Sequence, residues 1–268
     1  MQADGKRNLL GVLIDAVDYE GAVDSILQAA EARRGYSVTA LAVHGVMTGV
    51  QSASHRARLN QFDLITPDGQ PVRWALNLLH KTGLKDRVYG PTLTLKVCAE
   101  AARRGVPIYL YGSRQEVIDL MSKNLVDQFP GLIIAGAEPS KFRQTTEEEK
   151  RDVAERIKAS GAQITFVGLG CPRQEVFAYE YRDLINMPVL AVGAAFDYHA
   201  GTVSEPPAWM QDAGLQWLYR LVQNPRRLWR RYLILNPMYV TLVALQLTGL
   251  RSPEPKLTGQ PIPEIRYG

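Results

Sequence analysis

The chain has 268 residues, of which 46% are hydrophobic and 22% charged, and a formal net charge of +4. This composition excludes an intrinsically disordered chain and fits a globular protein of one large or two small domains. Its two cysteines and four histidines form neither a disulfide framework nor a zinc-binding spacing. The first ten residues carry no export signal, so we expect a cytosolic protein.

Apolar runs alternate with helical patterns over most of the chain. Residues 19–34 repeat apolar side chains at helical intervals, and residues 145–160 open with threonines and acids, as a helix N-terminus should. Continuous apolar strands that alternate with helices predict an α/β fold with a mostly parallel sheet flanked by helices. We predict strands over residues 9–17, 37–43, 62–66, 107–112, 132–137, 163–170 and 188–196.

The character of the sequence changes near Pro206. No strand is predicted beyond it, and residues 214–250 are helical in pattern, aromatic and basic. We therefore predict an α/β core over 1–205, a helical appendage over 206–253 and a flexible tail over 254–268. The arginines of the appendage recur at helical spacings and are predicted to line one helix stripe.

Four predicted strands end in loops with glycines or polar residues: "TPDG" (66–69), "YGSRQE" (111–116), "VGLGCPRQE" (167–175) and "VGAAFDYHAG" (192–201). Ligands of open parallel sheets bind beyond the carboxyl ends of the strands, so we expect these loops to meet at one site. The dinucleotide fingerprint GxGxxG and the GKS or GKT of a P-loop are both missing from the sequence.

Each of these loops has a structural and a functional interpretation. Asp68 is either a turn former or a carboxylate placed for acid–base work. Residues 167–175 either bind an anion at a helix N-terminus or only turn the chain. Cys171 is interpreted as an inert thiol rather than a nucleophile. Asp197 and His199 would point the same way in an extended segment; we interpret His199 as a local hydrogen-bonding residue and Asp197 as a site residue.

Several of these segments together resemble the WecG/TagA/CpsF glycosyltransferases (glycosyltransferase family 26). They are "TPDGQPVRW", "RVYGPTLTLKV", "YLYGS", "FVGLGCPRQEVF" and the long stretch from "AVGAAFDYHAG" to "NPRRLWRRYL". The resemblance implies an inverting enzyme that moves a sugar from a UDP-sugar onto a polyprenyl-diphosphate-linked glycan during surface polysaccharide biosynthesis. It also implies that residues 1–205 form a Rossmann-like catalytic core and that the helical appendage over 206–253 is membrane-associating. The enzyme is then expected to be peripheral, at the cytoplasmic face of the membrane, with no metal cofactor.

The resemblance also assigns roles to residues. Asp68 matches the aspartate proposed as the general base of the family. The UDP-sugar is expected to contact Gly112, Ser113, Gly168, Gly170, Pro172, Gln174, Glu175, Phe196 and Asp197. The acceptor or a diphosphate is expected to contact His44, Arg87, Arg220, Arg227, Arg230 and Arg231. Because many family members have an asparagine where this chain has His44, the identity of the donor sugar is not carried over.

A nucleotide-binding module with a basic C-terminus that contacts nucleic acid is the competing hypothesis. The aromatic side chains between the arginines, such as Trp217 and Trp229, favour a bilayer surface instead. A dehydrogenase would need a glycine fingerprint early in the chain. The expected partners are therefore a UDP-sugar, the lipid-linked acceptor, a membrane surface and, as an open possibility, a second copy of the chain, but no nucleic acid.

Overall fold

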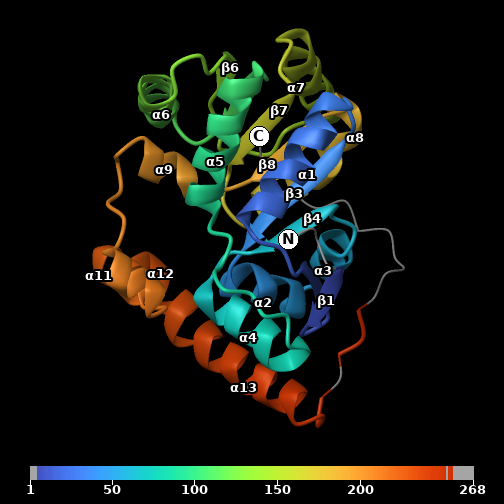
Figure 1. Ribbon diagram of the computed structural model, residues 1–268, viewed down its shortest axis with the longest axis vertical. Helices are drawn as coiled ribbons and strands as arrows, with labels where there is room; N and C mark the ends of the chain where they lie inside the picture. The colour runs from blue at the N-terminus through green and yellow to red at the C-terminus, as the bar shows by residue number, and fades with distance from the viewer. Residues whose placement is uncertain (1–4, 252, 256–268) are drawn as a thin grey trace.

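A parallel six-stranded sheet forms the centre of the computed structural model, which describes residues 5–251 and 253–255 (Figure 1). The strand order is β4-β3-β8-β7-β5-β6, and every neighbouring pair is parallel. The predicted α/β class is therefore confirmed. The strands are β3 (Tyr36–Leu41), β4 (Leu64–Pro67), β5 (Ile108–Gly112), β6 (Ile134–Glu138), β7 (Ile164–Gly168) and β8 (Pro188–Ala191).

The strand predicted over residues 9–17 is wrong, because the chain turns back inside this apolar run. β1 (Lys6–Leu9) and β2 (Val12–Asp15) form an antiparallel hairpin beside the main sheet. Gly11 adopts a φ of +88°, and its N–H donates to Oδ1 of Asn8 at 2.8 Å. A glycine takes this left-handed backbone conformation without the clash of a Cβ atom, so the turn forms in an otherwise continuous apolar segment.

Helices cover both faces of the sheet, and side chains that alternate along each strand feed two separate cores. In β5, for example, Ile108 and Leu110 join one core and Tyr109 and Tyr111 join the other. The first core is covered by α1 (Tyr19–Glu31), α5 (Gly90–Arg104), α6 (Gln115–Gln128) and α9 (Ala195–His199), and the second by α2 (Val43–Gln51), α3 (Ala53–Leu59), α4 (Gln70–His80), α7 (Glu147–Ala159) and α8 (Arg173–Ile185).

The predicted N-terminus of α7 is confirmed by its capping. Thr146 Oγ1 accepts from the N–H of Glu149 at 3.2 Å, and the Glu149 carboxylate accepts from the N–H of Thr146 at 3.0 Å. The reciprocal pair satisfies two backbone donors that have no partner inside the helix. An N-cap residue such as Thr146 stabilises its helix by about 1 kcal/mol relative to alanine.

The strand predicted over residues 188–196 is too long. β8 ends at Ala191, Gly193 turns the chain with a φ of +51°, and α9 begins at Ala195. Phe196 and Asp197 are consequently helical rather than strand-end residues. The run of small and apolar residues fits a buried strand and a buried helical turn equally well, so its periodicity does not distinguish them.

Beyond α9, every regular element among the described residues is a helix. The last of them, α13, runs along α4 and α2 (Figure 1), where Tyr239 and Leu242 enter the second core. The Tyr239 hydroxyl donates to the carbonyl of Pro71 at 3.0 Å. Residues 256–268 of the predicted tail lie outside the described residues. The helices are α10 (Ala208–Asp212), α11 (Gln216–Gln223), α12 (Pro225–Leu233) and α13 (Leu235–Leu247).

The predicted single stripe of arginines is wrong, because two helices share these residues. The chain leaves helical geometry at Asn224, with φ −143° and ψ 64°, and Pro225 starts α12. Proline is favoured in the first turn of a helix because its missing N–H would have no partner there. Arg220 therefore lies on α11 and Arg230 on α12.

None of the helices within residues 5–251 is both long and apolar enough to cross a bilayer.

The closest backbone approach in the sheet yields a prediction about stability. Gly112 adopts a φ of +113°, and a Cβ atom there would lie 2.8 Å from the carbonyl carbon of Gly168. We expect Gly112→Ala to lower the free energy of unfolding by about 2–4 kcal/mol, through backbone strain and steric clash. Gly105, at φ +66° with open space around it, is the matched control, and its alanine variant should lose only about 1 kcal/mol. Equal losses in urea denaturation would contradict the clash.

Candidate active site

A cleft of about 1000 Å³ opens at the carboxyl ends of the parallel strands. Ala42 follows β3, Asp68 follows β4, Ser113 follows β5, Gly170 follows β7 and Gly193 follows β8, and all five residues line it. The prediction that the strand-end loops come together at one site is therefore confirmed. A concave site at this edge of an open α/β sheet is where such folds bind their ligands.

Ten of the predicted site residues line the cleft, and they come from both halves of the chain. Of the others, Gly112 packs against the backbone of Gly168, Phe196 is fully buried, and Arg230 is exposed on α12. The side chains of Arg227 and Arg231 lie outside the described residues, and Pro172, at the start of α8, is not among the lining residues. The residues that line it are His44, Asp68, Arg87, Ser113, Gly168, Gly170, Gln174, Glu175, Asp197 and Arg220.

Asp68 lies between two elements that fix its carboxylate. β4 ends at Pro67 and α4 begins at Gln70, so Asp68 occupies the sharp connection between strand and helix. Its Oδ2 accepts from the N–H of Gly90 at the start of α5, at 2.9 Å. This hydrogen bond sets the orientation of the carboxyl group in the cleft. A carboxylate held in this way can accept a proton from a hydroxyl group that binds beside it.

Arg220 brings a positive charge to the opposite side of the cleft. Burial opposes the charge on its guanidinium, but the nearby Tyr232, Tyr198, Tyr89 and Asp68 hold its pKa above the usual range. Arg220 therefore stays charged in partly buried surroundings. A guanidinium in such a position can pair with the oxygens of a phosphate through two parallel hydrogen bonds.

Arg87 joins the C-terminal helices to the core. It is buried, with its guanidinium 4.2 Å from the ring centre of Tyr89. Its Nη1 donates to Oε1 of Gln216 at 2.6 Å, and its Nη2 donates to Oε1 of Gln211 at 2.7 Å. Gln216 in turn donates to the Tyr89 hydroxyl at 2.6 Å. The guanidinium predicted to bind a diphosphate thus holds α10 and α11 in place, and α11 lines the cleft.

Gln174 and Glu175 support the loop between β7 and α8 from within. Oε1 of Gln174 accepts from the N–H of Gly170 at 3.1 Å, and its Nε2 donates to the carbonyl of Ala191 at 3.3 Å. Oε1 of Glu175 accepts from the Thr39 hydroxyl at 3.1 Å. The polar atoms of both side chains are therefore engaged mainly with the protein.

Asp197 and His199 do not share a direction, because both lie on α9. Residues two apart on a helix are separated by about 200° around its axis, whereas in a strand they would point the same way. Asp197 faces the cleft, while Nε2 of His199 lies 3.0 Å from the carbonyl oxygen of Pro91. Burial lowers the pKa of His199, so its imidazole is neutral and structural, as interpreted from the sequence.

Other cleft residues were not predicted. Arg114 and Arg173 lie within the predicted loops 111–116 and 167–175 but were not singled out, although the strand-end rule could have identified them. The aromatic and amide side chains of the C-terminal helices carry no such signal, because they reach the cleft only through tertiary packing. The principal residues missed are Tyr89, Arg114, Arg173, Tyr198, Gln216, Trp217, Tyr232 and Asn236.

Comparison with known proteins agrees with the family suggested by the motifs. The sequence model of the glycosyl transferase WecG/TagA/CpsF family matches residues 7–253. The chain is 33% identical, over 219 residues, to an N-acetylglucosaminyldiphosphoundecaprenol N-acetyl-beta-D-mannosaminyltransferase of Bacillus spizizenii. This match covers 81% of each chain. The chain therefore belongs to the WecG/TagA/CpsF family of glycosyl transferases.

Proposed function

We propose that this protein transfers a sugar from a UDP-sugar, with inversion, onto a polyprenyl-diphosphate-linked N-acetylglucosamine during cell-surface glycan synthesis. The observation that carries the proposal is the Asp68 carboxylate, oriented by Gly90 in a cleft that also holds the Arg220 guanidinium. The acceptor class is supported by the Bacillus relative, which is named for its action on a diphosphoundecaprenol-linked N-acetylglucosamine.

In the proposed mechanism Asp68 acts as the general base. It takes the proton of the acceptor hydroxyl while the hydroxyl oxygen attacks the anomeric carbon of the donor. The bond between that carbon and the UDP oxygen breaks on the opposite face, so the configuration at the carbon inverts. Removal of the proton matters because a neutral hydroxyl is a weak nucleophile, and positioned base catalysis contributes about 10²–10⁴-fold to the rate.

Protein groups can stabilise the departing UDP. Arg114, Arg173 and Arg220 line the cleft, and residues 168–170 lead into the N-terminus of α8. Guanidinium groups and backbone N–H groups stabilise the negative charge that develops on a leaving diphosphate. We therefore include independence of a divalent metal in the proposal.

A membrane surface is the proposed location of the reaction. Large apolar side chains are exposed along the C-terminal helices and the turn after them, and Val222 and Val240 are 74% and 64% exposed. The same helices form one wall of the cleft, so docking them on a bilayer would bring the cleft to a lipid-linked acceptor. We propose peripheral binding to the cytoplasmic face. The exposed apolar residues are Trp209, Leu218, Val222, Trp229, Leu233, Ile234, Met238, Val240, Leu247 and Leu250.

The reaction can be tested with a panel of UDP-sugars and a short-chain polyprenyl-diphosphate-N-acetylglucosamine. We expect mass spectrometry to detect one added sugar from at least one donor, with EDTA present throughout. NMR of the product should show inverted anomeric configuration. Activity that requires added magnesium would contradict the metal-free mechanism, and retention of configuration would contradict direct attack by the acceptor.

Asp68→Asn tests the general base. The asparagine carbonyl can still accept from Gly90, so the fold and UDP binding should persist, while turnover should fall by about two to four orders of magnitude. Asp119→Asn provides a control, because Asp119 is an exposed carboxylate on α6 whose partner Gln115 lies on the same helix. Near-normal turnover of Asp68→Asn in steady-state assays would remove Asp68 from the mechanism.

Membrane docking can be tested by replacing Val222, Val240 and Leu250 with serine. Full burial of one such side chain contributes about 1.5–3 kcal/mol, so partial loss at three positions should weaken binding to anionic vesicles by roughly tenfold or more. Transfer to a water-soluble acceptor analogue should change little. Vesicle co-sedimentation measures the first effect and product formation the second.

The matched control replaces three exposed apolar residues near α6, Leu120, Val126 and Ile133, with serine. Figure 1 shows α6 and α13 at opposite ends of the molecule. This control should bind vesicles as the unmodified protein does. If both triple variants bind equally well, the C-terminal helices are not the membrane contact. If the unmodified protein instead binds nucleic acid more tightly than vesicles in the same salt, the competing function gains support.

A further inference from the structure

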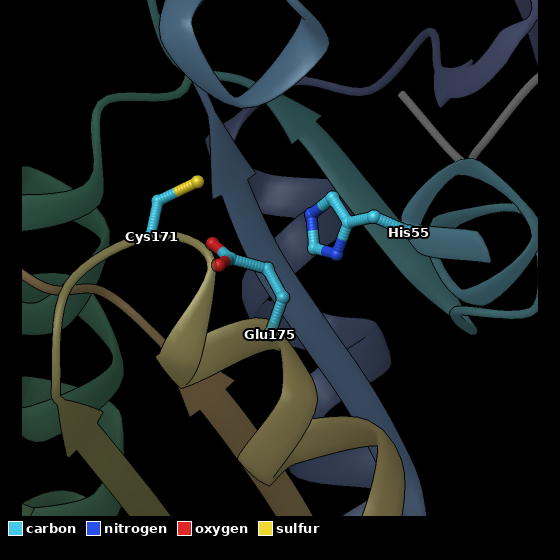
Figure 2. Close-up of side chains that lie close together, drawn as sticks. All are labelled: His55, Cys171 and Glu175. Atoms are coloured by element: carbon cyan, nitrogen blue, oxygen red, sulfur yellow. The ribbon is translucent and has the colours of Figure 1, made fainter. Parts of the chain in front are cut away.

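Three side chains converge behind the cleft wall that residues 168–173 form. His55 comes from α3, Cys171 from the loop after β7 and Glu175 from the first turn of α8, and Figure 2 shows the three directed toward a common centre. Their polar atoms lie within 4.8 Å of one another. His55 and Glu175 are each only 1% exposed, while Cys171 also lines the cleft. The cluster therefore connects the cleft wall to the interior.

Glu175 is the centre of a hydrogen-bond network that ties several strand ends together. Its Oε1 accepts from Thr39 on β3 and, at 2.9 Å, from Nε2 of Gln174. Gln174 also contacts the carbonyl of Ala191 on β8 and the N–H of Gly170 in the cleft wall. A change at Glu175 is thus transmitted directly to the backbone that faces the cleft.

The surroundings of His55 determine which of its ring nitrogens carries hydrogen. Nδ1 lies 3.3 Å from Nη1 of Arg58, and a guanidinium can only donate, so Nδ1 accepts. The hydrogen of the neutral ring is then on Nε2, which points toward Glu175 in Figure 2 and has no hydrogen-bond partner in the structure. Oε2 of Glu175 is likewise buried without a hydrogen-bond partner. A donor and an acceptor thus face the same small space.

This arrangement disfavours a metal ion in the cluster. A metal bound at Nε2 would move the ring hydrogen to Nδ1, where it would meet the N–H of Arg58. Histidine ligands normally donate from the second nitrogen to a carboxylate or carbonyl, and Arg58 offers neither. Burial and the charge of Arg58 also lower the pKa of His55 to about 4, so the imidazole remains neutral at physiological pH.

The groups that face Glu175 are a hydroxyl, an amide, a thiol and this neutral imidazole, from Thr39, Gln174, Cys171 and His55. The guanidinium of Arg58 lies on the far side of the imidazole ring. Burial without an adjacent cation raises the pKa of the Glu175 carboxyl. Oε1 accepts two hydrogen bonds, as the carbonyl oxygen of an uncharged carboxyl group can. A protonated Oε2 can donate to the Cys171 sulfur while it accepts from His55.

We propose that Glu175 is a positioning residue that works as an uncharged carboxylic acid, holding residues 168–173 in the shape that binds the donor diphosphate. Ionisation of Glu175 would leave a buried charge that only neutral groups surround. Because such a charge has a high free-energy cost, the hydrogen-bond network around Glu175 would open and let water reach the carboxylate. Glu175 acts through the loop and touches no reacting atom. The inference rests on the proposed function only in its choice of donor, since the state of the loop can be measured without any substrate.

The main test compares the unmodified protein with Glu175→Gln, which keeps the size of the side chain but cannot ionise. UDP affinity is measured by calorimetry across the range from about pH 6 to pH 10. Above the pKa of Glu175 we expect the affinity of the unmodified protein to fall by about tenfold per pH unit. The variant should not show this fall. Parallel profiles for the two proteins would overturn the proposal, because a purely structural residue would weaken binding equally at every pH.

Two further variants strengthen the comparison. Thr39→Val removes a donor that favours the ionised form of Glu175, so it should move the fall in affinity to higher pH; an unchanged midpoint would count against the proposal. This variant also serves if Glu175→Gln does not fold. Glu180→Gln is the matched control on the same helix, since Glu180 pairs with Lys150 at 2.7 Å, and it should keep the unmodified profile.

A substrate-independent readout separates this inference from the proposed function. Cys98 is fully buried, so a thiol reagent should label Cys171 first. Relative to Glu175→Gln at the same pH, labelling of Cys171 in the unmodified protein should accelerate as Glu175 ionises. Equal rates would overturn the inference even if UDP binds. If UDP does not bind at any pH, the proposed function fails and the labelling result alone decides the inference.

Stability and metal binding supply the last checks. Because the folded-state pKa of Glu175 lies above its ordinary value of 4.5, its contribution to stability is present at low pH. That contribution is lost as pH rises from the ordinary to the raised value. In urea denaturation, the free energy of unfolding of Glu175→Gln should not show this decrease with pH. The same decrease in the variant would contradict the inference. Tight zinc binding that His55→Ala abolishes would also overturn it, since the cluster would then be a metal centre.

Discussion

The parallel orientation of the six strands is the constraint on which the cleft depends. Because all of them point the same way, the loops after β3, β4, β5, β7 and β8 leave the sheet at a common edge. Each loop then leads into a helix whose first N–H groups face that edge. The fold thus collects polar groups and partial positive charges in one place before any particular side chain is considered.

Close packing at that edge limits which residues the loops can contain. Gly112 and Gly168 lie against each other, and the ring of Phe196 fills the space where a side chain on Gly168 would be. Behind them, Oε1 of Gln174 replaces a hydrogen bond that the N–H of Gly170 would otherwise make with water, and Glu175 accepts from the Gln174 amide. The glycines and buried polar groups therefore shape the wall of the cleft rather than recognise the ligand by their own side chains.

The opposite wall is attached by a different kind of interaction. Arg87 donates to two neutral glutamines, and these hydrogen bonds orient its positive charge. Arg220 adds a second, partly buried cation from α11. The wall thus combines charge directed at the cleft with apolar side chains exposed on the same helices. These two properties match the two parts of a lipid-linked diphosphate, its headgroup and its chain.

The sequence by itself determined the α/β class, four of the five strand-end loops around the cleft, and the family, because apolar periodicity and short loop motifs are local signals. It did not reveal the turn at Gly11, since an apolar run hides it, nor the helix that contains Asp197. Only the tertiary structure decided that Arg87 supports a wall and that His55, Cys171 and Glu175 share one buried space. These contacts join segments far apart in the chain, and their energies depend on burial and neighbouring donors, which no local pattern records.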